Sequence, residues 1–139
     1  DSDARLPRPV TGRLRTATVD DLALLMAWTE AFRVEAGLDL TPEQLAGDVE
    51  RGVRRGSQSL WIDADDRPCG LIAGSVIPPA GARIGPVYTP TALRGRGIGG
   101  AMVCALAQRL RDAGARCIFL FTDARNATSN ALYARIGFA

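Results

Sequence analysis

Four glycines and two arginines gather in one short segment, residues 93–100, which reads Leu-Arg-Gly-Arg-Gly-Ile-Gly-Gly. The segment follows an apolar strand and opens an apolar helix at about residue 98. Glycine lets the backbone approach a ligand without a Cβ clash. The first turn of a helix adds unpaired N–H groups and the positive end of its dipole, both of which suit an anion. The segment therefore predicts a phosphate or pyrophosphate site, to which Arg94 and Arg96 add charge.

Composition narrows the class of protein that holds this site. A length of 139 residues suits one domain with a proper core, and a net charge of +2 argues against nucleic acid or an anionic membrane as partner. All 17 basic residues are arginine, which excludes a Walker-type phosphate loop because that loop needs a lysine. The chain has no histidine, the commonest general base and metal ligand, and we expect no metal.

The three cysteines are odd in number and show no metal-ligand or redox spacing. Cys69, Cys104 and Cys117 each stand in an apolar run, so we expect all three to be buried free thiols. This usage is typical of a reducing cytoplasm. No apolar stretch is long enough to span a membrane and nothing resembles a signal peptide, so we expect a cytoplasmic protein.

The hydrophobic pattern alternates between strand and helix. Residues 1–12 are polar with two prolines and predict a tail or linker, followed by one domain over residues 13–139. The apolar run at 117–122 predicts a central strand that is buried on both faces. A strand, helix and strand in succession form a crossover, which predicts a parallel, right-handed pair in a mixed α/β (α+β) sheet. The expected strands are 13–18, 59–62, 69–77, 83–88 and 117–122, and the expected helices are about 20–37, 41–55, 98–113 and 127–136.

Other ligands also compete for the glycine segment. Gly95-x-Gly97-x-x-Gly100 matches the dinucleotide pattern, and Asp123 lies about 20 residues further on, where a ribose-binding acid belongs. Its position argues against a dinucleotide, because six residues separate the strand from the first glycine and the unit follows two helices. The alternative that the glycines only tighten a turn leaves the two arginines unexplained.

Two motifs together resemble a known family. Arg94-x-x-Gly97-x-Gly99, after a Val-Tyr-Thr-Pro strand end, resembles the signature [Arg/Gln]-x-x-Gly-x-[Gly/Ala] with which the GNAT superfamily of N-acetyltransferases binds acyl-coenzyme A. Residues 126–138 resemble its second motif, an asparagine helix that ends in Leu-Tyr-x-x-x-Gly-Phe. The resemblance covers about residues 13–139. It implies a GNAT-like β-α-α-β-β-β-α-β-α order and a sheet splayed between the strands at 83–88 and 117–122.

The resemblance implies a transferase that moves an acetyl group from acetyl-CoA directly to a primary amine of a small molecule or peptide. The pantetheine arm would lie along a strand edge like an added strand, and the glycine segment would hold the pyrophosphate through backbone N–H groups. The residues implied in cofactor binding are Val87, Tyr88, Thr89, Arg94, Gly95, Arg96, Gly97, Ile98, Gly99, Gly100, Asn126, Ser129, Asn130 and Tyr133.

The same resemblance places Tyr133 as the general acid that protonates the departing thiolate. Helical spacing puts it on one face with the asparagines and serine of the second motif. The general base stays open, because the strand at 83–88 has no carboxylate where many relatives place a glutamate. Glu30, Glu35 and Asp123 are the candidates. A water relay, or an amine that binds already deprotonated, is the alternative.

The sequence departs from the family pattern at both ends. A further strand normally follows Gly-Phe, but nothing follows Ala139, so we expect a strand that is disordered, cut away or supplied by a second copy in a homodimer. The linker-like start is typical of the C-terminal part of a longer protein with an attached N-terminal domain. A catalytically silent acetyl-CoA-binding regulatory domain is the second hypothesis. The missing strand carboxylate favours it, whereas Tyr133 favours the enzyme.

Overall fold

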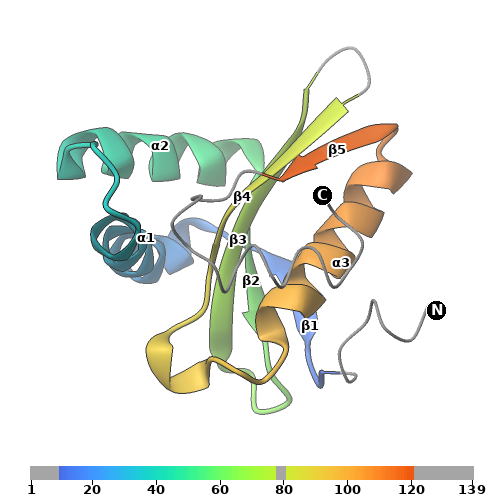
Figure 1. The fold of residues 1–139 in the computed structure, drawn as a ribbon, viewed down its shortest axis with the longest axis horizontal. Coiled ribbons are helices and arrows are strands. Elements are labelled where there is room, and N and C mark those ends of the chain that lie inside the picture. Colours follow the sequence, from blue (N-terminus) through green and yellow to red (C-terminus); the bar gives the residue numbers. More distant parts are fainter. Residues whose placement is uncertain (1–9, 78–80, 121–139) are drawn as a thin grey trace.

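The computed structural model of the chain describes residues 10–77 and 81–120 (Figure 1). The predicted strands and helices in this part of the chain are confirmed with small shifts of their ends, and the helix predicted at 127–136 lies outside it. None of the helices described is long and apolar enough to cross a membrane. The elements are β1 (Arg13–Thr16), the 3-10 turn η2 (Val19–Asp21), α1 (Leu22–Ala36), α2 (Pro42–Arg55), β2 (Gln58–Ile62), β3 (Pro68–Ile77), β4 (Gly81–Tyr88), the 3-10 turn η3 (Thr91–Leu93), α3 (Ile98–Asp112) and β5 (Cys117–Leu120).

The described strands form one mixed sheet in the order β1-β2-β3-β4-β5. The first three pairs are antiparallel, and β4 pairs with β5 in parallel, as the crossover through α3 predicts. Helices α1 and α2 cover one face of the sheet and α3 covers the other, so that the sheet is the middle of three layers (Figure 1). The mixed α/β class is therefore confirmed.

Local sequence signals set the helix ends. At the start of α2 the Thr41 hydroxyl accepts from the Gln44 N–H and the Gln44 side chain accepts from the Thr41 N–H, a capping box with Pro42 at the first helical position. Helices α1 and α2 end at Gly37 and Gly56, whose φ values of 66° and 74° favour glycine. These are the boundaries that the sequence indicates.

Two hydrophobic clusters occupy the two faces of the sheet. Ile72, Ile84 and Leu106 belong to the cluster under α3. Leu25 and Leu71 belong to the cluster under α1 and α2. Neighbouring residues Leu71 and Ile72 thus lie in different clusters, as the period of two in a strand requires.

Helix α3 lies close to the sheet because β3 carries glycine beneath it. A Cβ at Gly70 would lie 2.7 Å from Cε of Met102, and a Cβ at Gly74 would lie 2.7 Å from Cδ2 of Leu106. Both distances are below any ordinary carbon–carbon contact. The close approach fixes the height of α3 above the sheet, and with it the position of the helix N-terminus.

Strand β4 contains one extra residue relative to β3. Ile72 pairs with Val87 and Gly74 pairs with Ile84, so two steps on β3 match three steps on β4. A β-bulge of this kind inverts the alternation of side chains beyond it. Ile84 accordingly packs in the cluster under α3, whereas Tyr88, four residues later, packs in the cluster under α1 and α2.

The prediction of a strand buried on both faces is wrong for the part of β5 that the structure describes. Cys117 is exposed, and Phe119 is 57% exposed. The reason is position, because β5 is an edge strand of the described sheet and the cluster under α1 and α2 draws its sheet residues from β2, β3 and β4. The expectation of three buried thiols holds for Cys69 only, since Cys104 is half-buried.

The carboxylate of Asp21 links the chain that enters α1 to β1. Loss of its negative charge should change the free energy of unfolding measurably. Its carboxylate accepts from the Thr18 N–H and from both terminal nitrogens of Arg15, and the Arg15 contact is the main reason that the pKa of Asp21 lies below its ordinary value. A lowered pKa contributes stability that is complete above the unfolded pKa and is lost as the pH falls through the folded pKa.

We predict that Asp21→Asn lowers the free energy of unfolding by about 0.5–1 kcal/mol at pH 7. The difference from the wild type should shrink as the pH falls below about 4. Urea unfolding at a series of pH values measures it. Asp20→Asn is the control, because it removes a neighbouring charge without the capping contacts. An Asp21→Asn effect that is independent of pH would contradict this role.

Candidate functional site

The site begins at the C-terminal part of β4. Within the described residues, β5 pairs with β4 only from Gly81 to Ile84. The bulge follows at once, with Gly85 at a φ of 148° and with Pro86, which has no N–H to donate. Val87 and Tyr88 lie beyond the bulge. Backbone groups of an unpaired strand edge bind an extended ligand in the way that they bind another strand.

The glycine segment connects the end of β4 to α3. Gly95 and Gly97 both have a φ of 83°, a conformation that favours glycine, and Gly97 is the N-cap of α3. Glycine has no side chain that could accept from the first N–H groups of the helix. Its carbonyl accepts from Ala101 at 3.0 Å, and the N–H groups of Ile98, Gly99 and Gly100 precede the first bond of the helix. These donors and the dipole suit an anion.

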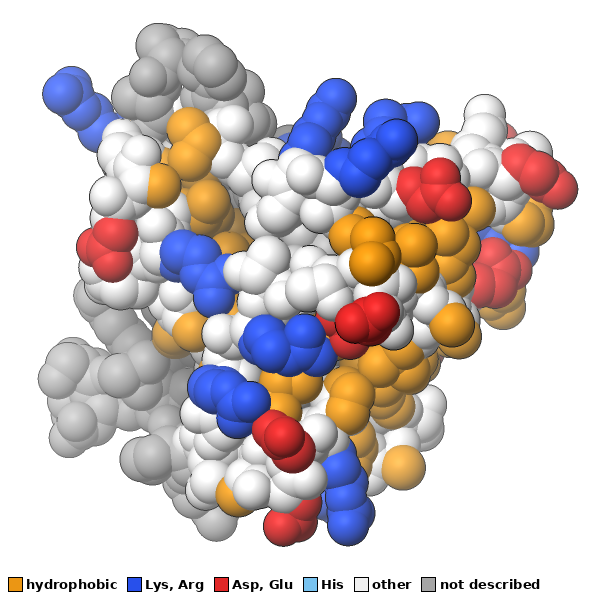
Figure 2. Space-filling model, turned by 180° about the vertical axis from the view of Figure 1, so that it is seen from behind, with side chains coloured by type: hydrophobic (Ala, Val, Ile, Leu, Met, Phe, Trp, Pro, Cys, Tyr) orange, Lys and Arg blue, Asp and Glu red, His pale blue; other side chains and the backbone are white. Residues whose placement is uncertain are grey.

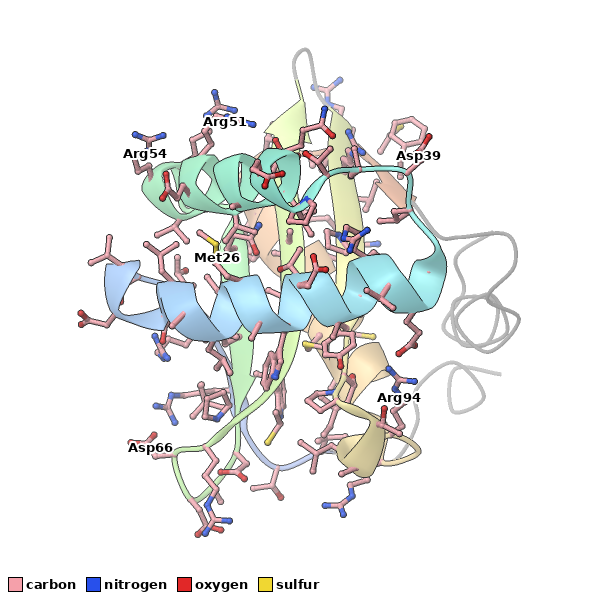
Figure 3. All side chains as sticks on the ribbon, turned by 90° about the vertical axis from the view of Figure 1, so that its left-hand side faces the viewer. Met26, Asp39, Arg51, Arg54, Asp66 and Arg94 are labelled. Atoms are coloured by element: carbon pink, nitrogen blue, oxygen red, sulfur yellow. The ribbon has the colours of Figure 1, made fainter. Side chains whose placement is uncertain are left out.

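The side chain of Arg94 contacts Glu35 near the C-terminal end of α1, and Figure 3 shows it beside that half of the helix. Its Nε donates to the Thr89 carbonyl at 2.8 Å, and one terminal nitrogen donates to Oε2 of Glu35 at 2.7 Å. The guanidinium carbon lies 5.6 Å from the centre of the Tyr88 ring. The Glu35 carboxylate is the main reason that the pKa of Arg94 is raised. A contact between this side chain and phosphate stays a prediction.

The structure places the two glutamate candidates for the base on α1, and both are bound to arginine. Glu35 bonds Arg94. Glu30 accepts from Nε of Arg33 at 2.8 Å and from a terminal nitrogen of the same side chain at 2.5 Å. These bonds hold the pKa of Glu30 below its ordinary value. A carboxylate with a lowered pKa is a weaker proton acceptor.

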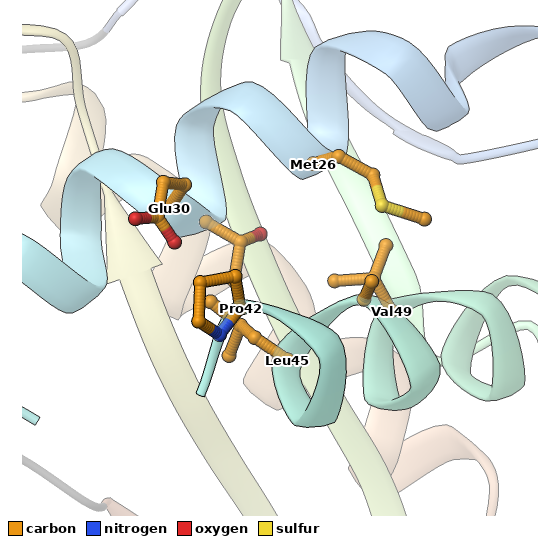
Figure 4. A pocket seen from close by; sticks show the side chains of 7 residues that line it. Met26, Glu30, Pro42, Leu45 and Val49 are labelled. Atoms are coloured by element: carbon orange, nitrogen blue, oxygen red, sulfur yellow. The ribbon is translucent and has the colours of Figure 1, made fainter. Parts of the chain in front are cut away.

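A hollow between α1 and α2, of about 210 Å³, was not predicted from the sequence (Figure 4). Figure 4 shows Met26 and Glu30 of α1 beside Pro42, Leu45 and Val49 of α2. Thr29 and Ala46 complete the lining, and the buried hydroxyl of Thr29 has no hydrogen-bond partner among the described residues. The sequence does contain one signal of this hollow: Thr29, a polar residue, lies four residues after Leu25 and so on the apolar face of α1.

The second motif lies outside the described residues. Asn126, Ser129, Asn130 and Tyr133, together with Asp123, therefore keep the roles that the sequence predicts for them as predictions. The structure brings together the end of β4, the glycine segment and the N-terminus of α3. It places Arg96 on an exposed turn and Glu30 at the hollow between the helices.

Residues 22–138 match the model of the acetyltransferase (GNAT) family. The chain belongs to this family. The match confirms the resemblance that the two motifs indicate. It covers both the glycine segment and the second motif, and it favours acyl-coenzyme A over a dinucleotide as the ligand of the glycines.

Relatives of known sequence and structure agree with this assignment. The chain is 34% identical, over 98% of its length, to a protein of Arthrobacter sp. named mycothiol acetyltransferase, and this match covers 44% of that protein. The chain spans about half the length of the curated relatives that it matches.

Solved structures confirm the fold. A GCN5-related N-acetyltransferase from Ralstonia eutropha superposes with a TM-score of 0.71 at 26% identity, over 91% of this chain and 92% of that one. A predicted acetyltransferase with acetyl-CoA from Clostridium acetobutylicum superposes with a TM-score of 0.71 at 18% identity, over 91% and 89% of the two chains.

A Cβ at Gly97 tests the role of the glycine segment. We predict that Gly97→Ala raises the dissociation constant of acetyl-CoA at least about ten-fold, because the N-cap backbone would leave its left-handed conformation or carry a methyl group at the phosphate position. Isothermal titration measures the change.

Gly56→Ala is the matched control for that variant. Gly56 has a similar φ, 74°, and a Cβ there would meet nothing within 4 Å. Gly56→Ala should lower the free energy of unfolding by a similar amount and leave the affinity for acetyl-CoA unchanged. Equal affinity in Gly97→Ala and the wild type would rule out this placement of the pyrophosphate.

Proposed function

We propose that residues 13–139 form an N-acetyltransferase domain that moves an acetyl group from acetyl-CoA directly to a primary amine of a small molecule or peptide. The observation that carries the proposal is the succession of the bulge in β4, the left-handed glycines and the N-terminus of α3 without a capping side chain. This succession joins the end of β4 to a set of anion donors.

Each part of this succession suits one part of acetyl-CoA. The backbone of Val87, Tyr88 and Thr89 would bind the pantetheine arm, although the Thr89 carbonyl already accepts from Arg94. The N–H groups between Gly95 and Gly100 would bind the pyrophosphate. When bound, acetyl-CoA supplies a thioester carbonyl, the electrophile of the transfer. Bound through Val87, Tyr88 and Thr89, it would lie beside the end of β4.

Two protons must move during the transfer. We propose that Tyr133 donates one to the departing thiolate. Glu30 and Glu35 remain candidate bases, but each would first have to exchange its arginine for the amine. An amine that arrives deprotonated, or that loses its proton to water, avoids this exchange. The two ion pairs favour that route.

The acceptor is a separate proposal. The curated relatives are named mycothiol acetyltransferase, so a small-molecule amine related to mycothiol is the first acceptor to test. The chain matches about half of each relative, so the acceptor of a relative does not transfer to this chain by similarity alone. We therefore propose the amine class and leave the choice of acceptor to assay.

The second hypothesis, a catalytically silent acetyl-CoA-binding domain, rests on β4. The strand reads Gly-Ala-Arg-Ile-Gly-Pro-Val-Tyr and offers no carboxylate beside the thioester. A nucleic-acid partner has less support, because arginines alternate with carboxylates and uncharged groups on the face that Figure 2 shows. Release of free thiol from acetyl-CoA over a panel of amines separates the two hypotheses. Cofactor binding without amine-dependent thiol release would favour the silent domain.

Replacement of Tyr133 by phenylalanine tests the proposed proton donor. We predict that Tyr133→Phe lowers kcat about 10²-fold or more and leaves the dissociation constant of acetyl-CoA within about two-fold of the wild type, because only proton donation is removed. Steady-state kinetics and titration measure the two quantities. A Tyr133→Phe variant with wild-type kcat would show that the tyrosine only packs.

A further inference from the structure

The guanidinium of Arg94 belongs to the phosphate-binding motif by sequence, yet it lies on the other side of the sheet from α3. Leu93 and Ile98 flank it in the chain, and both pack in the cluster under α3. The guanidinium instead lies over Tyr88, which belongs to the cluster under α1 and α2. The side chain therefore leaves the glycine segment and contacts the helix layer opposite.

Three groups, from α1, from the end of β4 and from the residue after it, hold this guanidinium. The carboxylate of Glu35, one residue before the end of α1, bonds a terminal nitrogen at 2.7 Å. The Thr89 carbonyl bonds Nε at 2.8 Å, and the Tyr88 ring faces the guanidinium carbon at 5.6 Å. Tyr88 is itself only 8% exposed, and its ring packs against Trp28 with the centroids 6.2 Å apart. The Tyr88 ring under the guanidinium is therefore held by its own packing.

The contacts of Arg94 fix the chain directly before the flexible glycines of the segment. A Cβ at Gly95, the next residue, would meet nothing within 4 Å, and glycine carries the largest backbone entropy of any residue. Beyond it, Gly97 fixes the start of α3. A segment that is held at Arg94 and at α3 loses little further entropy when its N–H groups bind an anion.

We propose that Glu35 and Arg94 act as one positioning unit, which holds the glycine segment in the shape that binds phosphate without contacting the phosphate. The proposal rests on the proposed function. It assigns Glu35 a structural role in cofactor binding instead of proton transfer, and it assigns the Arg94 side chain to the helix layer. Arg96 and the backbone donors then face the cofactor alone.

Charge removal at each partner distinguishes positioning from direct phosphate contact. We expect Glu35→Gln and Arg94→Gln each to raise the dissociation constant of acetyl-CoA about three- to ten-fold, and the double variant to bind no more weakly than the weaker single variant. If Arg94 contacts phosphate, Glu35→Gln would free it and strengthen binding, whereas Arg94→Gln would weaken binding. Opposite signs, or additive losses, would overturn the proposal.

Kinetics separate positioning from catalysis. The unit predicts that Glu35→Gln raises KM for acetyl-CoA and leaves kcat at saturating acetyl-CoA within about two-fold of the wild type. A fall in kcat with unchanged affinity would make Glu35 a base and overturn the proposal. Asp48→Asn is the control, because it removes an exposed ion pair with Arg51 on α2 and should change neither quantity.

Titration of the wild type with acetyl-CoA distinguishes failure of the proposed function from failure of the positioning role. If the wild-type chain binds no acetyl-CoA, the proposed function fails. If the wild type binds acetyl-CoA and Glu35→Gln binds it equally well, only the positioning role fails. Both side chains are about two-fifths exposed, 43% and 41%, so the variants should keep the fold, and urea unfolding of each confirms this before titration.

Discussion

One extra residue in β4 is the constraint on which the rest of the site depends. The bulge lies where the pairing of β4 with β5 ends in the described structure, and it contains Gly85 and Pro86. Because the bulge inverts the alternation of side chains, Val87 packs on the α3 side while Tyr88 packs under α1. Without the inversion, Tyr88 would face α3 and could not support Arg94. The extra residue thus places Tyr88 where it can support Arg94.

The position of α3 is the second constraint. Gly70 and Gly74 let the helix lie close to β3, and Arg109 ties its C-terminal half to the Leu14 carbonyl and the Ser59 hydroxyl at 3.2 and 3.1 Å. A helix held along its length presents its N-terminus in a fixed place, beside the end of β4. Anion donors that are already in place cost little to order when a ligand binds. The site is therefore a product of packing as much as of the glycine motif.

Much of the fold could be predicted from the sequence because its signals are local. Capping at Thr41, terminal glycines and the period of the apolar residues gave the elements, and the crossover rule gave the parallel pair. The bulge was missed, although Gly-Pro inside a strand was its signal. The bond between Glu35 and Arg94 joins residues 59 apart, and no local pattern indicates such a contact. The exposure of β5 depends on which strands lie beside it, which apolar composition does not report.

The central claim is that the backbone from the end of β4 to the first turn of α3 holds acetyl-CoA. Amide NMR of the ¹⁵N-labelled chain, titrated with acetyl-CoA and separately with NAD, tests it residue by residue. We predict saturable shifts that are largest for residues 87–89 and 95–100 with acetyl-CoA, and none of comparable size with NAD. Equal responses to both ligands, or shifts centred on another surface, would contradict the placement of the cofactor.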